Sequence, residues 1–203
     1  MLRRVMASQR YRRSLPAVAA ASVAVALAGV AGALAATSKP VVVSDAKEDV
    51  DGALDLQRSS LRLASDGRLR AVITLVGKVD PEAMLARSGP PGSVCLKIWT
   101  ARDADPDATA PDRLVCVTAQ SDDRLRASVF EQDDPGLPRR VGSASVGTNK
   151  SKRSLIVRIA QSALGRPELI RFAIESTRPG CARVSCIDAL PDKGAVRRFR
   201  IRG

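Results

Sequence analysis

Two runs of sequence decide the fold: SVCLKIWT at residues 93–100 and RLVCVTA at residues 113–119. Apolar side chains occupy every second position in both runs, which is the period of a half-buried β-strand. Aligned as an antiparallel hairpin, the runs place Cys95 opposite Cys116 on the more polar face and keep most of the apolar residues together on the other, although Ile98 lies opposite Arg113. The two sulfur atoms then lie within reach of each other, so the sequence predicts a Cys95–Cys116 disulfide.

The other two cysteines, Cys181 and Cys186, enclose the segment Ala-Arg-Val-Ser and predict a small disulfide loop. A redox pair is the alternative, but the pair lacks the C-x-x-C spacing that lowers a thiol pKa. An even number of cysteines in an exported chain favours disulfides over zinc, and the chain has no His to complete a zinc site.

Outward from the hairpin, short runs rich in Val, Ile, Leu and Thr recur between turn signals such as Ser65-Asp66-Gly67. One helical turn is expected within residues 80–92 and a brief turn or 3₁₀ piece within residues 162–167. Strands are expected over residues 54–63, 68–77, 93–100, 113–119, 124–131, 141–148, 153–160, 170–176 and 196–202. About nine such strands predict an all-β domain, an antiparallel two-sheet β-sandwich of jelly-roll or immunoglobulin type.

The N-terminus has the organisation of a secretory signal. Five arginines and no acid precede an uncharged, Ala- and Val-rich stretch that runs from Leu15 and ends in Ala33-Leu34-Ala35. A basic region, an apolar region and a small-x-small end predict a hydrophobic signal helix cleaved between Ala35 and Ala36. Residues 1–36 are therefore the predicted signal peptide, 37–50 a linker and 51–203 the β-sandwich domain of a secreted or envelope protein; an uncleaved membrane anchor is the alternative.

Composition argues against several classes of function. The net charge is +12, but five of these charges are arginines of the signal, which weakens any interpretation as a nucleic-acid-binding protein. The chain has no His for general-base chemistry, and no hydrolase, phosphate-loop or dinucleotide motif occurs in it. A non-catalytic domain is the prediction, and a hydrolytic enzyme with an unrecognised site is the alternative.

Aspartates crowd both ends of the predicted domain, with Asp45, Asp49, Asp51 and Asp55 at its start and Asp188 and Asp192 near its end. First and last strands are often neighbours in sandwiches, so these carboxylates are expected to converge. Carboxylate oxygens are calcium ligands, and the candidate set for a structural Ca²⁺ is Asp49, Asp51, Asp55 and Asp188. Solvated acidic turns are the alternative, and no other cofactor is predicted.

The C-terminal run RRFRIR at residues 197–202 is strongly basic. As a strand it lines one face with Arg198, Arg200 and Arg202, which makes these three the candidate contacts to a polyanion. An edge strand protected from aggregation by charge is the alternative. Bases stack on aromatic side chains, and few of these are present, so nucleic acid is not the expected polyanion.

Two short segments carry a resemblance: DGALDL at residues 51–56 and CIDALPD at residues 186–192. With them, the chain resembles a type of secreted actinobacterial β-sandwich domain of undefined function, similar in outline to DOMON and carbohydrate-binding sandwiches. The chain departs from the ligand-binding members, because without His a haem pair of the DOMON kind cannot form. The resemblance therefore implies a fold rather than a function.

Together these features predict an exported, non-catalytic domain that binds or adheres at the cell envelope. Its expected partner is an envelope glycan, an anionic polymer or an envelope protein. A membrane-tethered structural domain is the further alternative if the signal is retained.

Overall fold

A computed structural model describes residues 38–45, 52–101, 105–106, 109–121, 123–132, 137–181, 183, 186–192 and 195–201. The predicted signal peptide, with Ala35 and Ala36, lies outside the described residues. Contacts divide the chain into residues 1–33 and 34–203, and every described residue belongs to the second unit. Among the residues that the structure describes, none of the helices has the length and apolar character needed to cross a membrane.

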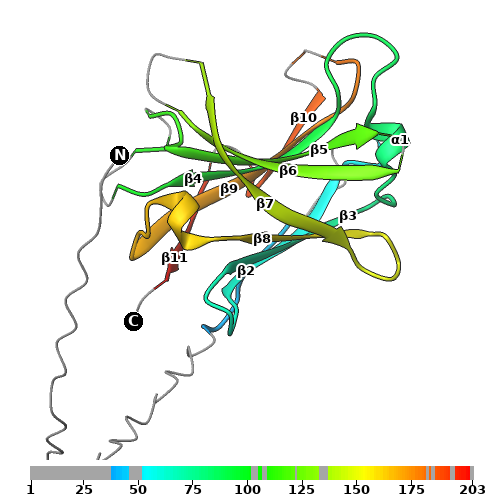
Figure 1. The fold of residues 1–203 in the computed structure, drawn as a ribbon. Helices are drawn as coiled ribbons and strands as arrows, with labels where there is room; N and C mark the ends of the chain where they lie inside the picture. The colour runs from blue at the N-terminus through cyan, green and yellow to red at the C-terminus, as the bar shows by residue number, and fades with distance from the viewer. Residues whose placement is uncertain are drawn as a thin grey trace, which may run out of the picture. The chain divides into compact units, whose positions relative to one another are not determined.

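The secondary structure of the described chain is mainly β-strand, with one helical turn and one 3₁₀ turn (Figure 1). Its elements are β1 (Val41–Ser44), β2 (Leu56–Leu63), β3 (Leu69–Leu75), α1 (Pro81–Met84), β4 (Ser93–Trp99), β5 (Arg113–Ser121), β6 (Arg124–Glu131), β7 (Arg139–Thr148), β8 (Ser154–Ile159), η1 (Gln161–Leu164), β9 (Leu169–Thr177), β10 (Ile187–Leu190) and β11 (Arg197–Arg200).

The all-β prediction is confirmed, and each of the nine expected runs forms a strand. Strands β4 and β5 pair in the register that alternation predicts, with Cys95 opposite Cys116 and Leu96 opposite Val115. The helical turn forms as α1, where the Asp80 carboxylate caps the helix by accepting a hydrogen bond from the Glu82 N–H.

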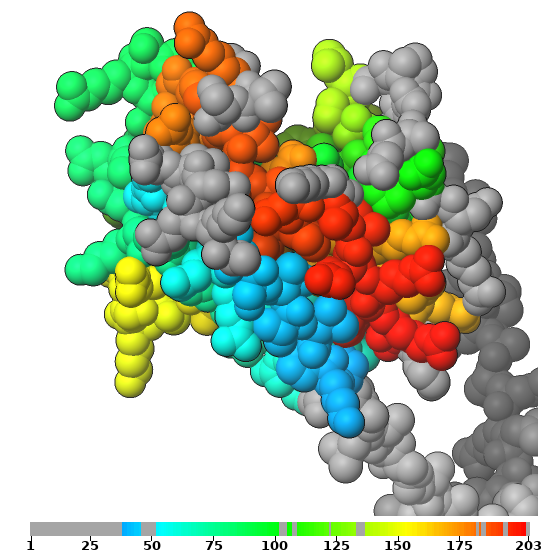
Figure 2. Space-filling model, turned by 180° about the vertical axis from the view of Figure 1, so that it is seen from behind, coloured from blue at the N-terminus to red at the C-terminus, as the bar shows by residue number. Residues whose placement is uncertain are grey.

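All strand pairs are antiparallel and form one path in the order β1-β2-β3-β8-β7-β6-β5-β4-β9-β10, with β11 also pairing β9. The two ends of this path approach each other, because β10 lies near β2 and β1 lies near β11. Seen from behind, the blue residues of β1 lie against the red residues of β11 (Figure 2). The sheet is therefore nearly closed, and a seam separates its first strands from its last.

Two separate sheets of jelly-roll or immunoglobulin type are not confirmed. Strand β7 pairs with β6 through Arg139–Ala144 and with β8 through Ser145–Thr148, so the hydrogen-bonded ladder continues from one half of the structure to the other. Alternation along each run predicts which face is buried. It does not predict that one long strand pairs with one neighbour along its first half and with another along its second half.

Two strands escape the sequence analysis. Strand β1 lies inside the segment 37–50 predicted as a linker, and its residues pair with β2 from Val41 opposite Leu61 to Ser44 opposite Arg58. Strand β10 pairs with β9 just after Cys186. Both strands are four residues long, which is too short for alternation to distinguish them from a loop.

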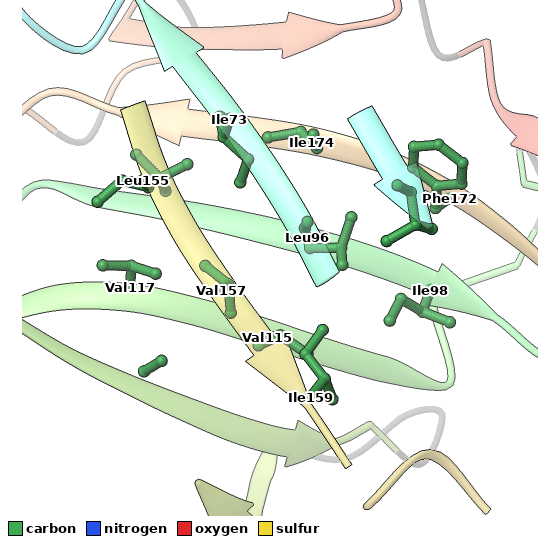
Figure 3. Close-up of a cluster of buried hydrophobic side chains, with 14 of the residues drawn as sticks. Ile73, Leu96, Ile98, Val115, Val117, Leu155, Val157, Ile159, Phe172 and Ile174 are labelled. Carbon is green, nitrogen blue, oxygen red and sulfur yellow. The ribbon is translucent and has the colours of Figure 1, made fainter. Parts of the chain in front are cut away.

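The core lies between the two halves of the sheet. Ile73, Leu155 and Val157 of β3 and β8 face Leu96 and Ile174 of β4 and β9 across it (Figure 3). Each of these side chains is no more than 2% exposed. Burial of the alternate apolar positions is the force that holds the strands in register.

A close approach at Gly77 fixes the segment in front of β2. A Cβ on Gly77 would lie 2.5 Å from the Cα atom and 2.9 Å from the carbonyl oxygen of Ala53, so only glycine fits there. We expect Gly77→Ala to lower the free energy of unfolding by about 1–3 kcal/mol, the usual cost of forcing backbone apart in a packed site. Urea denaturation monitored by Trp fluorescence measures the change.

Gly147 on β7 is the matched control, because a Cβ there meets nothing within 4 Å. Gly147→Ala is expected to leave stability unchanged or to raise it by about 0.5 kcal/mol, since alanine has fewer unfolded conformations than glycine. Equal losses in the two variants would contradict the assigned role of Gly77.

Candidate functional site

Three carboxylates meet at the seam of the sheet. Asp45 follows β1, Asp55 precedes β2 and Asp188 lies on β10, and one oxygen from each lies within 4.8 Å of the others. Asp55 and Asp188 are buried, at 4% and 3% exposed, while Asp45 is half-buried. The cluster therefore joins the start of the domain to its end.

Backbone hydrogen bonds fix the three residues. The Asp45 N–H donates to the Gln57 carbonyl at 2.9 Å, which extends the β1–β2 ladder by one residue. The Asp55 carbonyl accepts the Val76 N–H at 2.9 Å. Across the seam, the Leu56 N–H donates to Asp188 Oδ2 at 2.5 Å. A side chain of β10 thus completes the hydrogen bonding of β2 at a position that β1 does not reach.

Carboxylates this close together repel one another when ionised, so the cluster requires a compensating positive charge or a bound proton. An all-oxygen donor set of this kind suits hard cations such as Ca²⁺. Of the predicted ligands, Asp55 and Asp188 are brought together, whereas Asp49 and Asp51 lie outside the described residues. Asp45, which the sequence analysis leaves out of its ligand set, takes a place in the cluster. Calcium binding itself stays a prediction.

A basic depression of about 770 Å³ lies where β3 ends beside the turn from β7 to β8. Lys78, Lys150, Lys152 and Arg153 line it, and the side chains of all four are exposed. None of the four forms a salt bridge with any described residue. The depression therefore carries an uncompensated positive charge.

The turn that presents these cations is held by hydrogen bonds. Asn149 Oδ1 accepts the N–H groups of Arg153 at 2.9 Å and Ser154 at 3.1 Å. Lys152 adopts a left-handed conformation with φ 57°, and its carbonyl accepts the Val79 N–H at 2.6 Å. Two donors of the Arg153 guanidinium contact the Val76 carbonyl, at 2.6 and 3.2 Å. The depression is consequently preorganised.

Sequence reasoning finds this hairpin but not its basic depression. The signal in the sequence is the run NKSKR at residues 149–153, three cations within one turn. Lys78 joins them only because β3 pairs with β8 over a long sequence separation.

The predicted polyanion strip lies on β11. Arg198 and Arg200 are exposed and Phe199 is buried between them, as alternation predicts, while Arg202 lies outside the described residues. Strand β11 pairs with β9 on one side and lies near β1 on the other. It is therefore less of a free edge than the sequence analysis expects, because the seam nearly closes over it.

Both predicted disulfides are present, Cys95–Cys116 between β4 and β5 and Cys181–Cys186 before β10. Because no cysteine is free, neither pair is held as a dithiol. Trp99 is buried at 3% exposed, and its Nε1 donates to the Thr109 carbonyl at 3.0 Å. The single tryptophan is thus covered and offers no stacking surface to a sugar ring.

No protein-family model matches the sequence, and comparisons with curated proteins and with solved structures found no match either. The geometry of the described residues therefore carries the functional argument alone.

Proposed function

We propose that this chain is an exported, non-catalytic domain that binds an anionic ligand at the cell envelope. We also propose that the domain folds as a two-sheet sandwich similar to DOMON and carbohydrate-binding domains. The observation that carries it is the basic depression, in which four exposed cations converge with no acidic partner among the described residues.

Export is supported by the two disulfides together with the N-terminal signal sequence. Disulfides persist in oxidising, extracytoplasmic compartments and are rare where thiols are kept reduced. A domain displayed there meets charged wall and surface polymers.

An anionic ligand is favoured over a neutral glycan. Sites for neutral sugars use exposed aromatic rings, and Trp99, the chain's only tryptophan, is buried beneath the β4–β5 connection. Three cations of a fixed turn, together with Lys78, suit sulfate, phosphate or carboxylate groups instead, since charge-assisted hydrogen bonds are stronger than neutral ones.

The test starts from the full-length chain, produced in a bacterium that secretes it. The exported protein is expected to begin near Ala36. It is then titrated with dextran sulfate, with neutral dextran as the reference. We expect binding to dextran sulfate alone, and we expect Lys150→Gln combined with Lys152→Gln to weaken it about tenfold through loss of two charged contacts.

The comparison variant is Arg198→Gln combined with Arg200→Gln, which removes the same charge from β11. Its affinity is expected to stay near that of the parent protein. If this variant loses the binding and the lysine variant keeps it, the depression is not the site. Retention of the whole chain in the cytoplasm would refute the export half of the proposal.

A further inference from the structure

Three arginines form a row across three neighbouring strands of the outer face. In the β2–β3 pair, Arg62 lies directly opposite Arg70, and in the β3–β8 pair Arg70 lies directly opposite Arg158. Neighbouring strands are about 4.8 Å apart, so the three side chains leave the sheet within about 10 Å of one another. Arg58 lies four positions before Arg62 on β2 and therefore points to the same face of the sheet.

This arrangement is costly for the fold. Like charges that lie directly opposite each other destabilise a sheet. The salt bridges among the described residues involve other side chains, and none reaches this row. The Nε atom of Arg70 is buried with no hydrogen-bond partner in the described part of the chain. The row is therefore a concentration of charged donors that forms no salt bridge with the described residues.

A groove of about 470 Å³ extends over β2 from the end of the row at Arg62. Arg58 and Arg62 line it together with the hydroxyl-bearing Ser60 and Thr74. Its floor is completed by apolar contacts from Val42, which is 41% exposed, and from Val72. Charged, hydroxyl-bearing and apolar side chains thus line one groove.

We propose that the row Arg62–Arg70–Arg158 and the adjoining groove bind a linear phosphate-bearing polymer. A guanidinium presents paired donors that match two oxygens of one phosphate, which a lysine does not do. Three such forks in a line at the spacing of β-strands suit successive anions on one chain. A single small anion would bind one guanidinium and would not contact the hydroxyl groups and valines of the groove.

The inference goes beyond the proposed function, because it assigns a second ligand to a different surface, and it rests on that function only for the export that brings this face to an envelope polymer. The row and the basic depression lie at opposite ends of the β3–β8 pair. Arg70 and Val76 are six residues apart on one face, or about 20 Å along the strand. The two surfaces can therefore be separated by mutation.

The experiment expresses the full-length chain, purifies the protein from whichever cell fraction contains it, and measures its affinity for long-chain inorganic polyphosphate, tripolyphosphate and orthophosphate. We expect affinity to fall in that order, because one chain occupies several forks at once. Arg70→Gln and Arg158→Gln are each expected to weaken polyphosphate binding about tenfold, and Arg70→Lys about threefold, since lysine keeps the charge but loses the fork. Arg158 is exposed, so its variant keeps the test valid if Arg70→Gln impairs folding.

Arg126→Gln is the matched control, an exposed arginine on β6 outside the row. It is expected to lower the affinity for polyphosphate by less than about twofold, because it removes one positive charge from the protein without removing a contact to the ligand. Equal losses in Arg126→Gln and Arg158→Gln would overturn the inference, as would tighter binding to phosphatidylglycerol vesicles than to polyphosphate. Without ligand, the row variants should melt at or above the temperature of the parent protein; a lower melting temperature for Arg158→Gln would mark the row as structural.

The two proposals fail separately. If only the Lys150→Gln, Lys152→Gln variant loses polyphosphate, the arginine row is not the site and the proposed function stands. If the chain is not exported but the row variants lose polyphosphate, the proposed function fails and the binding surface stands.

Discussion

Replacing Asp188 with alanine is expected to lower the free energy of unfolding by about 2–3 kcal/mol, because it leaves the buried Leu56 N–H without its acceptor. The Asp188 side chain is 3% exposed and water cannot easily take its place. The side chain also makes the hydrogen bond that joins β10 to β2 across the seam. Urea denaturation of the full chain, followed by fluorescence and by circular dichroism, measures the loss.

Asp188→Asn is the matched control. The amide oxygen has the same shape and can accept the Leu56 N–H, so we expect a loss of less than about 1 kcal/mol. An equal loss in the two variants would show that the negative charge matters more than the hydrogen bond.

The same measurement tests the calcium prediction. A cation that binds only the folded protein stabilises it by RT ln(1 + [L]/Kd). If Asp45, Asp55 and Asp188 hold Ca²⁺, the parent protein gains stability over that in chelator, and Asp188→Ala gains none. A gain of equal size in both proteins would place the cation elsewhere.

Removing the Cys95–Cys116 disulfide, with both residues changed to alanine, is expected to cost about 3 kcal/mol. The bond joins residues 21 apart and restricts the unfolded chain accordingly. It also links the central strands β4 and β5. In the same register, the neighbouring residues Leu96 and Val115 lie opposite each other. Thermal unfolding monitored by circular dichroism provides the measurement.

The Cys181–Cys186 pair provides the comparison, because its separation is only five residues. The shorter loop predicts a smaller loss on removal, about 2 kcal/mol. A larger loss at Cys181–Cys186 than at Cys95–Cys116 would contradict the loop argument. It would show instead that the short loop holds β10 in place at the seam.

The residues of the β4–β5 hairpin determine their own structure. Alternation determines which face of each run is buried, and the register that brings the two cysteines opposite each other keeps most of the apolar positions together. Local pattern suffices here because the two runs lie close in sequence and their burial is one-sided. The same reasoning locates the other seven expected strands and α1.

The candidate sites depend on pairings that no local pattern records. Asp188 meets Leu56 across 132 residues, and Arg158 comes to lie beside Arg70 only because β8 inserts next to β3. The positions of the aspartates in the chain predict that the two ends approach each other, and Asp55 and Asp188 do meet, with Asp45 as a further member. The predicted ligands Asp49 and Asp51 lie outside the described residues. Sequence analysis also directs attention to Arg198 and Arg200, which are adjacent in sequence, and overlooks arginines that are adjacent only in the sheet.

By itself the sequence determined that the domain is all-β, which faces of its strands are buried and which cysteines are joined. These properties follow from the two-residue period of a strand, which is local. Only the tertiary structure decided that β7 joins the two halves into one nearly closed sheet, and that carboxylates gather at its seam and arginines on its outer face. Charged side chains on the solvent side carry no period that encodes a partner, so their neighbours are set by strand order alone.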